Sequence, residues 1–277
     1  MKMAYRIDWI DYAKAIGILL VFIGHCDIPG VNPYIYMFHM PLFFIISGIC
    51  WNVERNRSIP FLEFVNKKFG AYIIPYFKIC IVCLLLLGIP EAYLQFGTST
   101  DFTSRMGKYL LGITFSRGNT EWLPHCSPVW FLTCLFCAEV LMWVVMKQKK
   151  EWMQYVLIVI AAVLGYVTSL YGKILPWNID SAFTALPLIF VGIKIRECMI
   201  EKKVDIWVFS LFVIASIVFF LCGVSDVDFD GNHYENMPLM YISSITISLA
   251  IIIAVKLIGG GADSLCYWSG NLVVDGV

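Results

Sequence analysis

Eight long apolar segments constrain this chain more than any other feature. They lie at about 10–28, 33–51, 70–89, 128–146, 153–171, 180–195, 205–223 and 238–258. An apolar run of about 20 residues is long enough to cross the hydrocarbon core of a membrane as a helix. Strands that span a membrane alternate apolar and polar residues, whereas these runs are continuous. The sequence therefore predicts an all-α, polytopic membrane helix bundle with about eight transmembrane helices, built as a single domain over 1–277.

The composition agrees with a protein that lies largely in lipid. Hydrophobic residues make up 60% of the chain, charged residues make up 14%, and the mean hydropathy is +0.77. Soluble domains are nearer one quarter charged. The formal net charge is zero, which gives no indication of a nucleic-acid partner. The sequence contains no zinc-type spacing of ligands, so no metal site is predicted.

Cysteines are numerous but their pattern is ordinary for apolar helices. Cys80 and Cys83, like Cys134 and Cys137, have CxxC spacing within apolar segments, where cysteine usually serves as a small apolar residue. Cys26 and Cys126 fall on the predicted outer side, where a disulfide between them remains open.

Basic residues are distributed unevenly over the connecting segments. If the N-terminus lies inside, the inner segments contain fourteen Lys and Arg residues and the outer segments contain four. Cytoplasmic segments of membrane proteins carry an excess of Lys and Arg. The chain is therefore predicted to lie in the cell (inner or plasma) membrane as a multi-pass protein with a cytoplasmic N-terminus. Within the mixed segment 90–127, we expect the stretch from Met106 to Phe115 to lie on the interface or to re-enter the membrane.

Ionisable residues within the first span are functional candidates, because charge at membrane depth is costly. Lys14 and His25 are eleven residues apart, which is about three helical turns. They therefore share one face of a helix and are separated by about 16 Å along its axis. Gly17 and Gly24 lie near that face and leave room beside it. Asp11 lies one turn before Lys14, where the two can form an ion pair.

The second span adds two further candidates. His39 opens this span as part of His-Met-Pro, and a proline is tolerated in the first turn of a helix. Ser47 and Gly48 are small residues that let another helix approach closely. From the residues alone, His39 can equally be an interfacial histidine bonded to a carbonyl, and Ser47 a packing residue.

These segments resemble acyltransferase family 3, the integral-membrane O-acyltransferases that decorate bacterial surface sugars, including the fucose 4-O-acetylase-like subgroup. The first helix of that family has a basic residue, a ten-residue gap and a histidine, as in IDYAKAIGILLVFIGH, although the basic residue there is often Arg. The second helix resembles FHMPLFFIISG. Similar segments follow in Lys67-Lys68 before Ile74-Pro75-Tyr76, in PVWFL around Trp130, in DSAFTALPLIFVG, and at Asn232 and Tyr234 before the last span.

The resemblance implies a function and a set of site residues. It implies an O-acyltransferase, with O-acetyl transfer expected, that moves an acyl group from cytoplasmic acyl-CoA to a hydroxyl of a cell-surface or lipid-linked glycan. Acyl-CoA, expected to be acetyl-CoA, is then a co-substrate, and no tightly bound cofactor is expected. The implied catalytic residues are His25 and His39. The residues implied for binding of substrate and acyl donor are Lys14, Lys67, Lys68, Ser47 and Trp130.

Other interpretations stay open for these residues and for the chain. The histidines can be hydrogen-bonded in the bundle, the basic residues can simply follow the charge asymmetry, and tryptophans such as Trp122, Trp130 and Trp177 can mark membrane interfaces. A transporter or permease also contains buried Lys and His, although we find no inverted repeat. An inactive, truncated remnant is a further alternative. The family usually has more helices, and SLCYWSGNLVVDGV resembles the start of a ninth.

We expect reporter fusions to confirm the predicted orientation. A reporter joined after Lys149 should be active in the cytoplasm only, and one inserted between Cys222 and Pro238 should be active outside only, because of the charge asymmetry. An outside signal from the reporter at Lys149 would contradict the layout.

Overall fold

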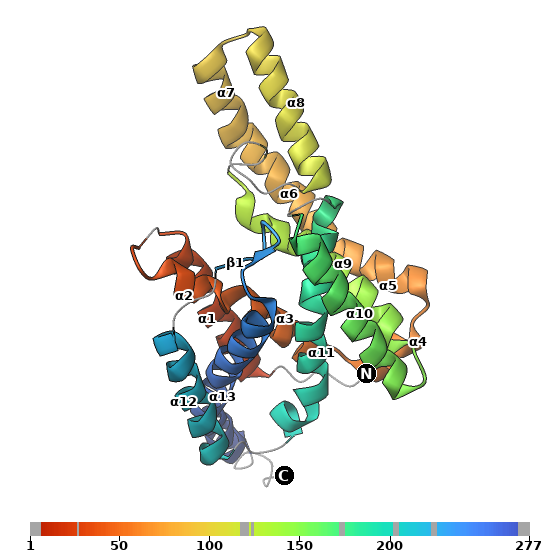
Figure 1. Cartoon of the computed structure of the whole chain (residues 1–277), viewed down its shortest axis with the longest axis vertical. Coiled ribbons are helices and arrows are strands. Elements are labelled where there is room, and N and C mark those ends of the chain that lie inside the picture. The colour runs from red at the N-terminus through yellow and green to blue at the C-terminus, as the bar shows by residue number, and fades with distance from the viewer. Residues whose placement is uncertain are drawn as a thin grey trace, which may run out of the picture. The chain divides into compact units, whose positions relative to one another are not determined.

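The computed structural model describes residues 7–26, 28–116, 122, 125–171, 175–201, 205–222 and 226–270 (Figure 1), and the side chains of 201, 222 and 259–270 are outside that description. Contacts divide the chain into two compact units, which we describe separately. The first comprises Met1–Cys50, Val191–Val227 and Tyr234–Val277, and the second comprises Trp51–Phe190 and Asp228–His233.

Every predicted span falls on a helix, which confirms the prediction of an all-α membrane bundle. Within the described residues, five helical stretches are long and apolar enough to cross a membrane: Asn32–Cys50, Phe61–Phe96, Ser127–Met146, Glu151–Ser169 and Met237–Ile258. The span predicted at 205–223 corresponds to the shorter apolar helix Ile206–Leu221. The spans predicted at 10–28 and 180–195 correspond to α1 (Asp8–Gly24) and α11 (Ile179–Glu201), which carry charged residues near their ends. A small hairpin of β1 (Val227–Asp228) and β2 (His233–Tyr234) is the exception to the helical pattern in the described residues.

The first unit is organised around α13 (Met237–Gly270). This helix contacts α1, α3 (His39–Cys50) and α12 (Ile206–Cys222), and α1 also contacts both α3 and the short helix α2 (Asn32–Tyr36). The stretch expected to start a ninth helix instead continues α13 as far as Gly270, and residues 271–277 lie outside the described part of the chain.

Glycines allow the helices of this unit to approach one another closely. A Cβ atom at Gly17 of α1 would lie 2.7 Å from the Cζ of Phe43 on α3. At Gly192 of α11, a Cβ atom would collide with the carbonyl oxygen of Ile45 and lie 2.9 Å from the Cα of Gly48. The close helix approach predicted at Ser47 and Gly48 is therefore confirmed, and Gly192 is the residue that meets it.

In the second unit, one long helical stretch contains the span that was predicted at 70–89. It runs from α5 (Phe61–Lys68) through α6 (Ile74–Cys83) to α7 (Ile89–Phe96), and two π-helical segments, η1 (Phe69–Ile73) and η2 (Leu84–Gly88), join these parts. A proline follows each segment at the second position of the next helix. Proline lacks an N–H and its ring clashes with the carbonyl four residues earlier, so a π-bulge relieves the conflict without ending the helix. The 36 residues span about 54 Å, more than the membrane core of about 30 Å.

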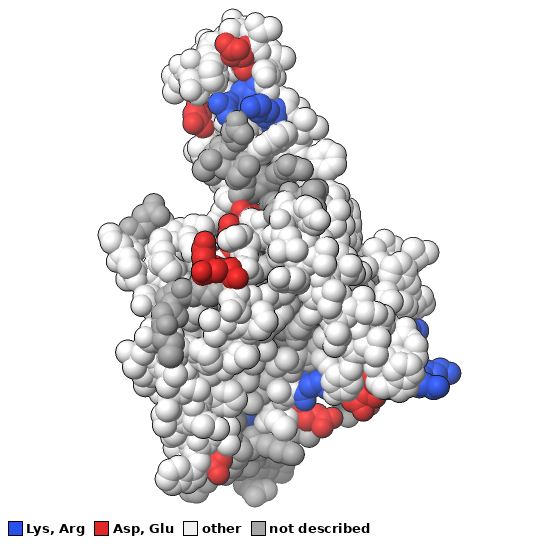
Figure 2. Space-filling view, in the orientation of Figure 1, with Lys and Arg blue, Asp and Glu red and all other residues white. Residues whose placement is uncertain are grey.

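The end of this helix pairs with α8 (Thr100–Phe115) in a helical hairpin (Figure 1). Gly97, with φ +60°, makes the turn. The guanidinium of Arg105 lies 5.6 Å from the ring centre of Phe96 and 5.9 Å from that of Tyr109. Figure 2 shows basic and acidic side chains gathered over this hairpin, whereas most of the visible face carries no charged residue. The stretch from Met106 to Phe115, expected on the interface or re-entrant, is thus the second half of α8.

The centre of the second unit is α9 (Trp130–Met146). It contacts α4 (Val53–Ser58), α5, η1, α6, α10 (Glu151–Ser169) and the 3₁₀ turns η3 (Ser127–Val129) and η4 (Pro176–Asn178). At its C-terminal end, the side chain of Arg57 donates to the carbonyl of Met146 and, at 3.3 Å, to that of Gln148. A cation suits this position because the last carbonyls of a helix have no partner within it.

We expect Gly192→Ala to destabilise the protein by about 1–3 kcal/mol, because the added methyl group meets backbone atoms of α3 that cannot move independently. The matched control is Gly107→Ala on α8, where no atom lies within 4 Å of the added Cβ. This control should be neutral or slightly stabilising, because alanine favours helix by about 1 kcal/mol over glycine. Thermal unfolding of the detergent-purified variants measures both, and equal behaviour would contradict the packing described here.

Candidate active site

His39 is buried at the start of α3, and its ring has a defined hydrogen bond. Its Nδ1 lies 2.9 Å from the carbonyl oxygen of Ile35. A carbonyl oxygen can only accept, so Nδ1 carries the proton in this contact. In the neutral imidazole this leaves Nε2 with a free electron pair. The local chain therefore presents Nε2 of His39 as a group that can accept a proton.

Tyr36 joins the end of α1 to the start of α3. Its hydroxyl donates to the carbonyl of Gly24 at 2.9 Å, and its ring packs on that of His39 with 5.3 Å between centroids. His25 follows Gly24 directly as the C-cap of α1, and its side chain is exposed. Tyr36, which the sequence did not single out, therefore connects the residue before His25 to His39, and both predicted catalytic histidines lie at the junction of α1, α2 and α3.

Lys14 lies three turns earlier on α1, about 16 Å from His25 along the helix. Its Nζ is 3.6 Å from Oδ1 of Asp11, and the two side chains are 44% and 38% exposed. The ion pair predicted between them is confirmed. Ser47 is half-buried on α3, eight residues beyond His39 or about 12 Å along the axis. Neither residue is placed beside the histidines.

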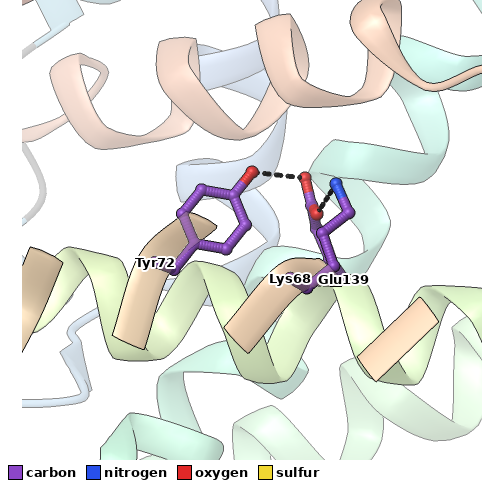
Figure 3. A network of polar contacts seen from close by, with 3 residues as sticks. All are labelled: Lys68, Tyr72 and Glu139. Atoms are coloured by element: carbon purple, nitrogen blue, oxygen red, sulfur yellow. Dashed lines mark hydrogen bonds and ion pairs between the residues drawn. The ribbon is translucent and has the colours of Figure 1, made fainter. Parts of the chain in front are cut away.

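The second unit contains a buried ion pair that involves another predicted residue (Figure 3). Lys68 forms an ion pair with Glu139 of α9, and the hydroxyl of Tyr72 donates to the other oxygen of that carboxylate at 3.1 Å. Glu139 is only 2% exposed. The ammonium of Lys68 also lies 5.5–5.6 Å from the ring centres of Trp51, Phe64 and Tyr72. Such aromatic faces stabilise a cation that has lost part of its water.

The two lysines that were predicted to bind the donor therefore have different surroundings. Lys68 is held by an internal carboxylate, whereas its neighbour Lys67 is exposed. Glu139 is not among the site residues expected from the sequence, although it is the only charged residue in the span predicted at 128–146. A single carboxylate within an apolar span is itself a signal, since an unpaired charge there is costly.

Trp130 begins α9 and is buried. Its carbonyl accepts from Oγ1 of Thr133 at 2.8 Å and from Nδ2 of Asn178 at 3.4 Å, and its ring meets that of Phe131 edge-on. Asn178 is itself fully buried and also donates to Thr133. This environment favours a packing role for Trp130 over stacking on a sugar.

The signature of one family, described as an acyltransferase domain, matches residues 7–265. The chain belongs to acyltransferase family 3. No curated protein and no solved structure matches it. The protein is therefore a membrane acyltransferase that transfers groups other than amino-acyl groups, and this family membership decides against the permease alternative.

We expect Lys68→Met to destabilise the acyltransferase by about 3–5 kcal/mol, because it leaves the buried carboxylate of Glu139 without its cation. Replacing both residues with methionine should restore most of this loss, because a well-packed apolar pair carries no buried charge. Lys67→Met, at the exposed neighbouring position, should change stability by less than about 0.5 kcal/mol. Thermal unfolding in detergent tests all three variants, and equal losses for the Lys67 and Lys68 variants would contradict the assigned pair.

Proposed function

We propose that this acyltransferase moves an acyl group, with acetyl expected, from cytoplasmic acyl-CoA to a hydroxyl of a cell-surface or lipid-linked glycan. The observation that carries the proposal is the junction of α1 and α3, where Tyr36 contacts both buried His39 and Gly24, the residue before exposed His25. Histidine is the side chain best suited to accept a proton near neutral pH. In an acyltransferase this pair supplies the base that the reaction requires.

The chemistry assigns a role to each histidine. As the acceptor oxygen attacks the thioester carbonyl, a C–O bond forms and the hydroxyl proton passes to an imidazole nitrogen. The intermediate then collapses with cleavage of the C–S bond, and the CoA thiolate leaves and is protonated. His25 is the proposed base, because it matches the family motif and its exposed ring can be reached by an acceptor. His39, held through Ile35 and Tyr36, is proposed to orient the acceptor or to assist proton transfer.

Two exposed or half-exposed lysines, one in each unit, are proposed to bind phosphates of the donor on the inner side. Lys14 and Lys67 can both reach solvent, and an ammonium group binds phosphate as a point charge. The phosphates of CoA would compete with Asp11 for Lys14. In the predicted orientation, Lys14 lies toward the cytoplasmic end of α1 and His25 toward the outer end, which suits a donor inside and an acceptor outside. The proposal includes an acceptor like that of the fucose 4-O-acetylase-like subgroup. It also includes the cell membrane as the location.

Substitutions on α1 separate the base from the donor site. His25→Ala should lower kcat by about 10²–10⁴-fold, because the acceptor loses its general base. Lys14→Ala should mainly raise KM for acyl-CoA, because it removes a contact that is present before the chemical step. Lys14→Arg should be tolerated, since arginine retains the charge. The assay incubates membranes that contain the protein with labelled acetyl-CoA, followed by mass analysis of the surface glycans.

The matched control is His233→Ala, which removes an exposed histidine on β2. It should retain transfer at the level of the unmodified chain. Near-normal turnover by His25→Ala at normal expression would contradict the assignment of His25 as the base. The base would then have to be sought at His39 or His125.

A further inference from the structure

The second unit contains a pocket that the proposed function does not use. Three cysteines line it, together with His125 and Tyr109. Cys80 and Cys83 are one turn apart on α6, and Cys126 directly precedes η3. The segment between these cysteines forms η2, α7 and α8, so the pocket lies where the base of the helical hairpin meets the start of α9.

Cys126 is the common neighbour of the other two thiols. The side chain of Cys126 interacts with those of both Cys80 and Cys83, and all three cysteines line the same pocket. Cys80 and Cys126 are buried in one apolar cluster with Tyr76 and Ile113, while Cys83 is half-buried at the edge of that cluster. All three are free thiols. A disulfide places its two Cβ atoms about 3.5–4.5 Å apart, and thiols that line one small pocket need only a limited movement to reach that separation.

Sulfur–sulfur chemistry suits this cluster better than metal binding. Within the residues that the structure describes, no group of three or more His, Cys, Asp or Glu side chains is arranged to hold a metal ion. The interaction with the Cys80 side chain, together with burial, raises the pKa of the Cys126 thiol. The Nε2 atom of His125 is engaged by Oε2 of Glu91 at 2.6 Å. All three cysteines are free, so joining two of them requires an oxidant.

We propose that Cys126 and the CxxC pair of α6 form a dithiol–disulfide site, in which Cys126 bonds to Cys83 or Cys80 and the third thiol remains available for exchange. The oxidant is a disulfide compound. The thiolate of half-buried Cys83 attacks one sulfur of that compound, giving a mixed disulfide and releasing one thiolate. Cys126 then attacks the sulfur of Cys83 and displaces the second thiolate, while Cys80 can exchange into the bond. Two cysteine thiols are oxidised, the reagent is reduced to two thiols, and both protons pass to them.

The bond would brace the α7–α8 hairpin against α9. It closes a loop of more than 40 residues, from α6 through the hairpin to η3. A disulfide that closes a loop of this length stabilises a fold mainly by reducing the conformational entropy of the unfolded chain. The predicted orientation places Cys126 on the outer side, where disulfides form and persist. The inference stands apart from the proposed acyl transfer, because it concerns other residues and needs no acyl donor.

A cleavable version of the full chain tests the site without an activity assay. A recognition site for a sequence-specific protease is inserted after Thr98, which is exposed in the turn between α7 and α8. The protein in membranes is treated with a dipyridyl disulfide, cleaved, and separated under denaturing conditions. We expect the two fragments to remain linked, and to separate only after a thiol reductant is added. Fragments of the oxidised parent chain that separate without reductant would overturn the proposal.

Variants identify the thiols that form the link. Cys126→Ser should release both fragments without reductant, as should Cys80→Ser combined with Cys83→Ser. The matched control is Cys26→Ser, which removes an exposed cysteine outside the cluster and should leave the link intact. Mass spectrometry of the oxidised, unsubstituted chain gives a result that is independent of variant folding. It should detect a peptide that joins Cys126 to Cys80 or Cys83, and finding all three alkylated as free thiols would overturn the proposal.

Discussion

A charge within an apolar bundle must be neutralised where it lies, and the pair of Lys68 and Glu139 shows how strongly this constrains the second unit. The carboxylate is almost fully buried on α9, and its partners come from the helix that runs through α5 and η1. Three aromatic rings surround the ammonium and replace part of its hydration. The π-helical segment η1 contains Tyr72, the third member of the network, and is followed by Pro75. The irregularity that accommodates this proline therefore lies within the same turn that contacts the buried carboxylate.

The first unit depends instead on small residues that allow close helix packing and on polar side chains that bond to backbone carbonyls. Gly17 and Gly192 allow helices to approach within the width of a side chain. Without a hydrophobic driving force between helices in lipid, such close packing provides most of the attraction. At the junction of α1 and α3, the polar groups of Tyr36 and His39 find carbonyls at Gly24 and Ile35. The contacts that satisfy the backbone there also fix the tautomer of His39 and tie its helix to the end of α1.

The sequence was sufficient to predict the helices, the Asp11–Lys14 pair and the family, because each depends on local spacing. Apolar length identifies a span, and a separation of three residues on a helix brings two charges together. The sequence did not predict that the third span would extend over 61–96, since two prolines usually interrupt a helix and here π-bulges absorb them. The partner of Lys68, the bridge made by Tyr36 and the meeting of Cys126 with α6 also escaped prediction. Each joins residues that belong to different helices, and only packing determines which ones meet.

The most direct test of the account is a double-mutant cycle of kcat/KM on His25→Ala and His39→Gln, measured with labelled acetyl-CoA in membranes. In the proposed function the two histidines serve one proton transfer, and residues that act as a unit should not have independent effects. We predict that each single variant loses most of the activity and that the double variant is about as slow as the slower single one. Losses that multiply in the double variant, or an unimpaired His39→Gln, would contradict a shared catalytic role for this pair.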